Sequence, residues 1–218
     1  ISNSEDLSTL TIKNNSFDLA VEAADIEINQ LNEPIGYQDQ FGCAIGGIKK
    51  ITFNPDKSVL VEPITLRSNQ MEELNNNLIL FQVGQPRSAS KILKTQSDKT
   101  KADEETFNRL LKIRDLAEEL SIEIHTDIDS VGHYLNSNWQ EKRQLTKDIS
   151  TNEIDEIYQT AIKNGAIGGK LLGAGQSGFI LFYCKRKNQE KLSKKLSKLK
   201  CFPVKVDDLG VTSKSKFR

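Results

Sequence analysis

Apolar residues recur at helical spacing near the start of the chain, at Phe17, Ala20, Val21, Ala24, Ile28 and Leu31. Side chains three and four positions apart share one face of a helix, so this stripe predicts a helix over residues 17–31. Asn15 or Ser16 is suited to cap its start. Pro34 follows its end, because proline cannot continue the backbone hydrogen-bond ladder.

Shorter apolar segments predict strands. Gly46-Gly47 precedes an apolar run that ends at Phe53, a turn follows at residues 54–56, and residues 59–64 return as the second strand of a hairpin. Three further runs also predict strands, at residues 78–83, 179–184 and 202–206.

Helical periodicity dominates later segments, at residues 104–120 and 128–145. Ser150 with Glu153 forms a capping box for a third helix, and Asn164-Gly165 ends it. Residues 187–200 predict a basic amphipathic helix, for which a solvated outer face is favoured over a membrane or nucleic-acid surface. The mixture of elements predicts an α+β or mixed α/β fold, with a boundary near residues 66–73.

Charge and composition exclude several function classes. Thirty Lys and Arg balance thirty Asp and Glu, so nothing in the net charge favours nucleic acid or an acidic membrane as the main partner. No apolar run approaches the roughly 18 residues that cross a bilayer, and the first residues lack the features of a signal peptide. The three cysteines are interpreted as reduced thiols of a cytoplasmic protein, and the two histidines lack partners for a zinc site.

A glycine-rich segment offers one candidate for chemistry. Residues 168–178 hold five glycines in eleven positions, directly before an apolar strand. Successive backbone N–H groups in such a loop can form a concavity that binds an anion. A tight turn before a core strand explains the same glycines, and composition alone does not decide between the two.

Two carboxylates, Glu27 and Asp39, form a second candidate, twelve positions apart. Asp39 follows a glycine turn and lies between Gln38 and Gln40, which could orient it by hydrogen bonds. One carboxylate could hold a divalent cation while the other takes a proton from an attacking hydroxyl. The alternative is a solvated helix carboxylate and a turn aspartate.

These segments occur together with two others, Leu78-Ile-Leu-Phe-Gln-Val-Gly-Gln-Pro-Arg-Ser-Ala-Ser90 and Trp139-Gln-Glu-Lys-Arg-Gln-Leu145. The set, in this order, resembles the GHMP superfamily of small-molecule kinases, and most closely its branch acting on D-glycero-D-manno-heptose 7-phosphate. The resemblance extends from about Phe17 to Asp207. It implies a two-domain fold, with residues 1–66 as the latter part of the N-terminal domain and 71–218 as a ferredoxin-like C-terminal domain.

The resemblance also implies roles for individual residues. Asp39, within Gly36-Tyr-Gln-Asp-Gln40, matches the family's proposed base, and Glu27 matches its Mg²⁺ ligand. The loop that supports the phosphates corresponds to Gly173, Ala174, Gly175, Gln176, Ser177 and Gly178, where Gln176 and Ser177 replace two glycines. Further candidate substrate contacts are Gly36, Gln38, Arg87, Lys142 and Arg143, with an ordinary surface charge as the alternative for each of the three cations.

The implied activity is ATP-dependent, Mg²⁺-dependent phosphorylation of a sugar or sugar phosphate, at the anomeric hydroxyl. A homodimer is left open. The family's phosphate-binding Gly-Leu-Gly-Ser-Ser-Ala stretch is not found in residues 1–15, and the chain lacks an initiator Met. We therefore expect the sequence to be a piece of a longer protein, or the product of a decayed gene. A non-catalytic sugar-sensing or assembly protein on the same fold is the alternative function.

Overall fold

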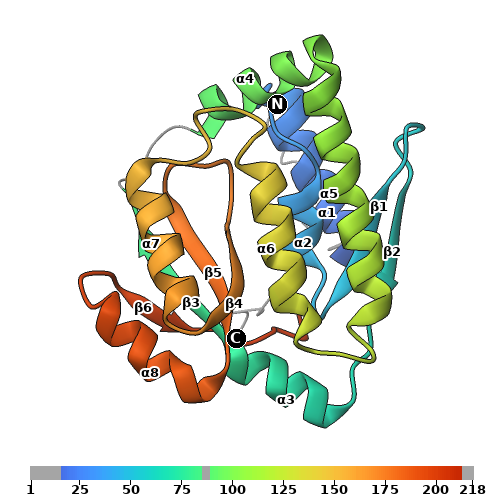
Figure 1. The fold of residues 1–218 in the computed structure, drawn as a ribbon. Helices are drawn as coiled ribbons and strands as arrows, with labels where there is room; N and C mark the ends of the chain where they lie inside the picture. The colour runs from blue at the N-terminus through green and yellow to red at the C-terminus, as the bar shows by residue number, and fades with distance from the viewer. Residues whose placement is uncertain (1–15, 85–88, 213–218) are drawn as a thin grey trace, which may run out of the picture. The chain divides into compact units, whose positions relative to one another are not determined.

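The computed structural model describes residues 16–84 and 89–212 (Figure 1). Their contacts divide the chain into two compact units. Unit 1 combines residues 1–47 with 207–218, and unit 2 is residues 48–206. The division near residue 66 that the family resemblance implies concerns the domains of a whole kinase and stays a prediction.

Unit 1 contains the predicted first helix, in two parts. An α-helix, α1 (Ser16–Ala24), continues as a π-helical turn, η2 (Asp25–Gln30), and a short helix, α2 (Gln38–Ala44), follows. Ala20 and Ala24 are buried, and the ring of Phe17 meets that of Phe41 edge-on, with centroids 5.2 Å apart. The apolar stripe therefore packs α1 against α2.

The first two strands of unit 2 form the predicted hairpin, β1 (Lys49–Phe53) with β2 (Val59–Pro63). The pairing is antiparallel, and Lys57, with φ of 68°, lies in the turn between the strands. Lys50 forms ion pairs with Glu62 across the hairpin, at 2.9 Å, and with Glu118 of the long helix α5 (Glu104–Glu123), at 3.1 Å. The contact with Glu118 attaches the hairpin to α5.

The other four strands of unit 2 form one antiparallel sheet, in the order β4-β5-β3-β6. They are β3 (Leu78–Val83), β4 (Ala166–Leu171), β5 (Gly178–Cys184) and β6 (Cys201–Pro203). Four helices separate β3 from β4, and one helix separates β5 from β6. This order of strands and crossovers is the ferredoxin-like arrangement. The α+β fold predicted from the sequence is confirmed.

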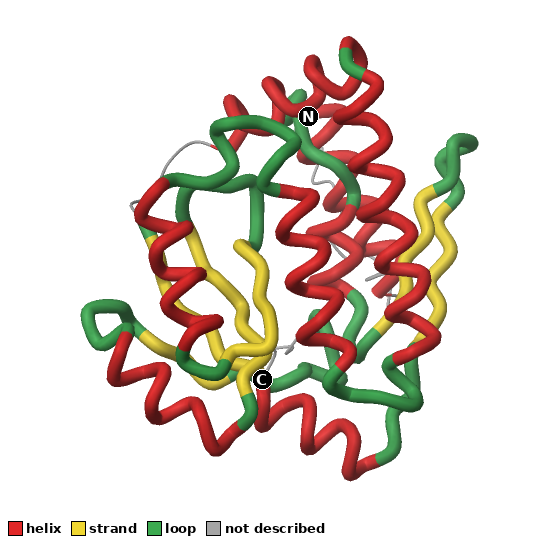
Figure 2. Tube along the Cα trace, viewed as in Figure 1, coloured by secondary structure: helices red, strands yellow, loops and turns green. Residues whose placement is uncertain are grey.

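Six helices complete the described part of unit 2, and they can be followed in Figures 1 and 2. They are α3 (Ser68–Asn77), α4 (Ala89–Ala102), α5 (Glu104–Glu123), α6 (Ser130–Lys142), α7 (Asn152–Lys163) and α8 (Arg186–Lys195). The sequence indicated α5 to α8 but neither α3 nor α4. The cap of α7 is also corrected: the Thr151 hydroxyl, rather than Ser150, accepts a hydrogen bond from the N–H of Ile154, at 3.3 Å.

The main core lies on one face of the four-stranded sheet. Large side chains of the strands, among them Phe81, Ile180 and Phe182, pack there with Tyr158 of α7 and Leu192 of α8. A smaller cluster around Leu74, Ile128 and Tyr183 lies apart from it. The two helices that follow the predicted capping and amphipathic patterns thus cover the sheet face that carries most of the apolar burial.

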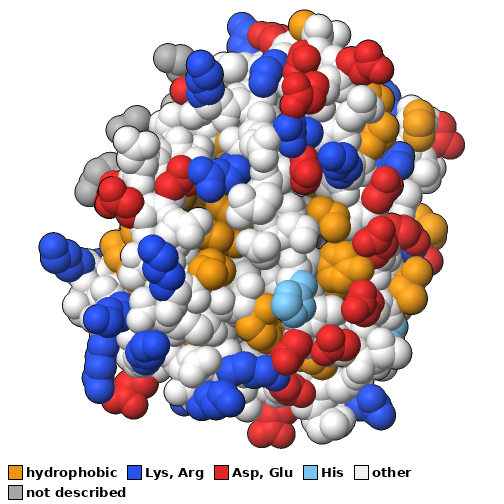
Figure 3. Space-filling model, viewed as in Figure 1, with side chains coloured by type: hydrophobic (Ala, Val, Ile, Leu, Met, Phe, Trp, Pro, Cys, Tyr) orange, Lys and Arg blue, Asp and Glu red, His pale blue; other side chains and the backbone are white. Residues whose placement is uncertain are grey.

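The surface agrees with the balanced composition. Lys and Arg side chains are interspersed with Asp and Glu over the face drawn in Figure 3. Among residues 16–84 and 89–212, no helix combines the length and the apolar character needed to cross a membrane.

Candidate functional site

The glycine-rich segment is half strand and half loop. Gly168 and Gly169 belong to β4, where a Cβ on Gly168 would lie 1.9 Å from the carbonyl oxygen of Gly132 in α6. Glycine is therefore needed for α6 to approach the strand. Residues 172–177, which we call the glycine loop, connect β4 to β5. β4 was not predicted from the sequence, because its glycines were assigned to the loop.

The glycine loop is fixed at its base and at its far end. Leu172 N–H donates to the carbonyl of Phe179, and Gln176 N–H to the carbonyl of Ile149, both at 2.9 Å. Gly175 has φ of 134°, and a Cβ there would lie 2.8 Å from the Ile149 Cα. The segment that links α6 to α7 therefore packs against the loop and accepts one of its hydrogen bonds.

Three consecutive N–H groups of the glycine loop have no protein acceptor. They belong to Gly173, Ala174 and Gly175, and none of them donates to another residue within the described part of the chain. A run of unpaired N–H groups in a turn of mixed-sign φ is the arrangement that binds anions such as phosphate. This is the chemical capacity that the sequence predicted for the segment.

One lysine contacts this loop, and a second precedes the loop in β4. The Lys142 ammonium donates to the carbonyl oxygen of Gly173, at 2.5 Å, and to that of Leu171, at 3.4 Å. Lys142, expected as a substrate contact, thus holds the loop backbone. Burial lowers the pKa of the Lys170 ammonium, at the end of β4. A desolvated cation gains the most from a nearby anion, so both lysines favour a negatively charged ligand.

The two other cations predicted as substrate contacts are Arg143 and Arg87. Arg143 forms an ion pair with Asp155 of α7, at 2.5 Å, and Asp155 also accepts a hydrogen bond from the Ser150 hydroxyl, at 2.6 Å. Arg143 therefore ties the end of α6 to the start of α7. Arg87 lies outside the described residues.

Asp39 lies in the first turn of α2 and is exposed, like Gly36 and Gln38 before it. Its carboxylate makes no hydrogen bond or ion pair with another described residue. The expected orientation of Asp39 by its neighbours is wrong for this structure. Gln40 is buried, and its side-chain oxygen has no partner within the described residues.

Glu27 is half-buried in η2, the π-helical turn that the sequence did not indicate. Leu31 N–H donates to the carbonyl of Ile26, five residues back, at 2.9 Å. A π-turn shifts the side-chain register of a helix, and such turns are frequent at functional sites. Within residues 16–84 and 89–212, no three Asp, Glu, His or Cys side chains gather as metal ligands. A lone carboxylate still fits Mg²⁺, which commonly binds one or two carboxylates together with substrate phosphates.

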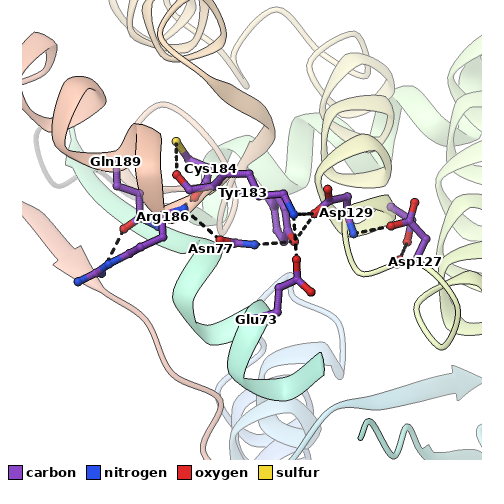
Figure 4. A network of polar contacts seen from close by, with 10 residues as sticks. Glu73, Asn77, Asp127, Asp129, Tyr183, Cys184, Arg186 and Gln189 are labelled. Atoms are coloured by element: carbon purple, nitrogen blue, oxygen red, sulfur yellow. Dashed lines mark hydrogen bonds and ion pairs between the residues drawn. The ribbon is translucent and has the colours of Figure 1, made fainter. Parts of the chain in front are cut away.

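A polar network that the sequence did not reveal lies elsewhere in unit 2 (Figure 4). Tyr183 donates to Asp129, at 2.7 Å, and accepts from Asn77, at 3.0 Å. Lys185 forms ion pairs with Asp129, at 2.5 Å, and with Glu73, at 2.9 Å. The network joins α3, the start of α6 and the end of β5. It is satisfied internally, which marks it as a structural tie.

Comparisons with known proteins agree with this geometry. Residues 113–205, which include α6, α7, β4, the glycine loop and β5, match the family model described as GHMP kinases C terminal. The resemblance to GHMP kinases is confirmed. The matched residues thus include the glycine loop, Lys142 and Lys170.

One curated GHMP relative is the D-glycero-alpha-D-manno-heptose 7-phosphate kinase of Campylobacter jejuni. It is 28% identical over 183 residues, which are 84% of this chain and 54% of that protein. The chain therefore spans about half the length of this relative. The predicted closeness to the heptose phosphate branch is confirmed.

Solved structures show the same fold. A D-glycero-D-manno-heptose 1-phosphate kinase from B. thetaiotaomicron has a TM-score of 0.65 and 22% identity, over 90% of this chain and 54% of that one. A galactokinase from Lactococcus lactis, complexed with galactose, has a TM-score of 0.62 and 15% identity, over 94% of this chain and 62% of that one.

Proposed function

We propose that these residues serve an ATP-dependent kinase that phosphorylates a hydroxyl of a sugar or sugar phosphate. The observation that carries the proposal is the glycine loop, which has three N–H groups without an acceptor among the described residues and the Lys142 ammonium bonded to its backbone. Phosphoryl transfer depends mainly on positioning and on neutralising charge at the phosphates. A fixed row of N–H donors, with the Lys142 ammonium bonded to the same loop, supplies both.

Asp39 is the proposed base. An exposed carboxylate without a hydrogen-bond partner among the described residues can accept a hydrogen bond from a substrate hydroxyl and take its proton as the phosphoryl group arrives. Glu27 would provide one oxygen ligand for Mg²⁺, which when bound neutralises negative charge on the nucleotide phosphates. Both residues are in unit 1 and the loop is in unit 2, so a common site is part of the proposal.

The proposed acceptor is heptose 7-phosphate, at its anomeric hydroxyl. The Campylobacter jejuni relative is named as a kinase for this sugar phosphate, and its similarity covers most of the chain. Galactose and other sugars of similar size are the competing acceptors for a test of specificity.

The alternative, a non-catalytic sugar-binding protein, rests on Gln176 and Ser177 in place of two glycines. The structure weakens this argument. Gln176 has φ of 60°, which lies in the left-handed region that non-glycine residues can occupy at modest cost. The loop therefore keeps a glycine-like path in spite of the substitution, which favours the enzyme.

The test uses the longest natural form of the protein that contains these residues. Asp39→Asn keeps the shape of the side chain but removes its charge and basicity. We expect kcat to fall at least about 10²-fold, with ATP affinity within a few-fold. Asp25→Asn is the matched control, because Asp25 is an exposed carboxylate in the same unit. An Asp39→Asn enzyme with unimpaired kcat would exclude Asp39 from the mechanism.

Two further measurements separate the roles. Glu27→Gln should raise the Mg²⁺ concentration needed for half-maximal rate, because a hard cation loses an anionic ligand. The 218-residue chain by itself should release no ADP above the enzyme-free background, since residues 1–15 lack the family's phosphate-binding stretch. Sugar-dependent ADP release by this chain alone would contradict that expectation.

A further inference from the structure

A segment near the C-terminus joins α2, the helix that carries Asp39. We call residues 207–211 the strap. Gly47 N–H donates to the carbonyl of Asp207, at 2.7 Å, and Val211 N–H to the carbonyl of Ala44, at 3.1 Å. Between these bonds, Ile45 and Gly210 form an antiparallel bridge. The strap thus satisfies the last carbonyl of α2 and fixes the chain that leaves it.

The contact between strap and helix allows no side chain on the facing residues. A Cβ on Gly210 would lie 2.4 Å from the Ala44 carbonyl oxygen, and a Cβ on Gly46 would lie 2.4 Å from that of Asp208. Gly210 also has φ of 68°, which favours glycine. The close approach is therefore a property of this particular pair of backbones.

The strap is shaped before it meets α2. The Asp207 carboxylate accepts hydrogen bonds from Leu209 N–H, at 3.3 Å, and from Gly210 N–H, at 3.1 Å. These two bonds bend residues 207–210 into a turn. The strap therefore presents its N–H and C=O groups to α2 in one conformation.

The helix itself is short. It spans Gln38–Ala44, and no side chain caps its N-terminus. Helices of this length are unstable in isolation and depend on packing. Phe41 and Ala44 pack α2 on one side, and the strap holds its C-terminal end.

We infer that the strap is a positioning device for Asp39, which rests on the proposed role of that residue as base. It keeps α2 from fraying or turning, so that the carboxylate of Asp39 keeps one direction toward the acceptor hydroxyl. Misplacing a reacting group by about 1 Å can reduce a rate about 10²-fold. The strap contacts no reacting atom in this account and acts only through α2.

The first arm of the test needs no activity. Hydrogen exchange is measured at the amides of Gly42–Ile45 in the 218-residue chain. Gly210→Val should increase their exchange about tenfold or more, because local opening becomes easier. Leu209→Ala changes a strap residue that is 74% exposed and should have no effect. Asp207→Asn, which weakens the strap turn without adding bulk, should give a smaller increase. Unchanged exchange in both Gly210→Val and Asp207→Asn would overturn the inference.

The second arm uses the longest natural form of the protein. Gly210→Val should lower kcat about tenfold or more, with the KM for ATP within about twofold. In an Asp39→Asn background the same change should cost almost nothing more, because residues that act as a unit are not additive. A further tenfold loss in that background, or faster exchange with unchanged kcat, would show that the strap serves only stability. If the parent form lacks kinase activity, the proposed function fails, and the exchange arm still decides whether the strap holds α2.

Discussion

The glycine loop and the α2 segment carry the two halves of the proposed chemistry, and they are built in opposite ways. Ile149, Phe179 and Lys142 all bond to the backbone of the loop or its edges. The Asp39 carboxylate is exposed and makes no hydrogen bond or ion pair with another described residue. Backbone donors can bind an anion only if packing fixes their direction, whereas a base must be accessible to its substrate. We therefore expect changes in the loop to reduce stability and changes at Asp39 to reduce rate.

The largest expected effect is on the free energy of unfolding, when one methyl group is added to the glycine loop. The same addition before α2 is the control. Gly175→Ala places a Cβ about 3 Å from the Ile149 backbone at a positive φ, so we expect a loss of about 3 kcal/mol in the free energy of unfolding. Gly36→Ala is the control, because no heavy atom lies within 4 Å of its added Cβ. Urea unfolding followed by the fluorescence of Trp139, the single tryptophan, measures both. Equal losses of unfolding free energy in the two variants would contradict the proposed difference between the glycine loop and the α2 segment.

The next effect concerns the lysine that holds the loop. Lys142→Met keeps the aliphatic stem but removes the hydrogen bond to Gly173, which should cost about 1.5 kcal/mol of unfolding free energy. Asp39→Asn should change the same quantity by less than about 0.5 kcal/mol, as for an exposed residue without partners. Denaturant titrations of both variants at neutral pH test the difference. If Asp39→Asn destabilises as much as Lys142→Met, Asp39 has a structural role.

A third prediction uses pH to compare carboxylates of the two units. Burial raises the pKa of Asp129, but the hydrogen bonds from Lys185 and Tyr183 outweigh burial, so its pKa lies below the usual value. Bonds from Asn29 and Gln30 also lower the pKa of Asp25, which is exposed in unit 1.

A lowered pKa means that the folded state holds the proton less tightly than the unfolded state. Stability from Asp129 is therefore present above its unfolded pKa of about 4 and is lost as the pH falls through its folded pKa. Asp129→Asn should remove about 1 kcal/mol of this dependence below about pH 5, and Asp25→Asn should remove little. Unfolding curves from neutral pH to about pH 3 decide the matter. An acid dependence unchanged in Asp129→Asn would contradict the assignment.

The smallest expected effects are on the free energy of unfolding, and they have opposite signs at two adjacent loop positions. Gln176→Gly removes the cost of a left-handed conformation, and should stabilise the fold by up to about 0.5 kcal/mol. Ser177 does not have a positive φ, so Ser177→Gly should destabilise it by about 0.5–1 kcal/mol. Thermal unfolding of the two variants, compared with the parent, reports the signs. A gain at Ser177 with a loss at Gln176 would refute the assigned loop geometry.

Much of the fold could be predicted where local pattern and burial agree. β3 has the predicted bounds, because an unbroken apolar run is typical of a strand in the middle of a sheet. β4 was missed because the glycines that allow α6 to approach it also conceal its strand pattern. η2 was missed because the apolar residues Ala24, Ile28 and Leu31 also fit the spacing of an uninterrupted α-helix.

The candidate site divides in the same way. Asp39 and Glu27 were indicated by motif and spacing, and their roles stay predictions. The contacts of Lys142 and Ile149 with the glycine loop could not be predicted. They join residues that are far apart in the chain and depend on how α6 and the segment after it pack beside β4.

The strap has a consequence for how the chain is made. Unit 1 closes only when residues 207–211 reach the end of α2, after all of unit 2 (residues 48–206) has been synthesised. At the usual rate of about 5–20 residues per second, the segment that carries Asp39 leaves the ribosome roughly 10–30 s before its last support. During that interval unit 2 can fold, whereas α2 lacks its hydrogen bonds with the strap. The proposed base is thus among the last parts of a newborn chain to reach its final position.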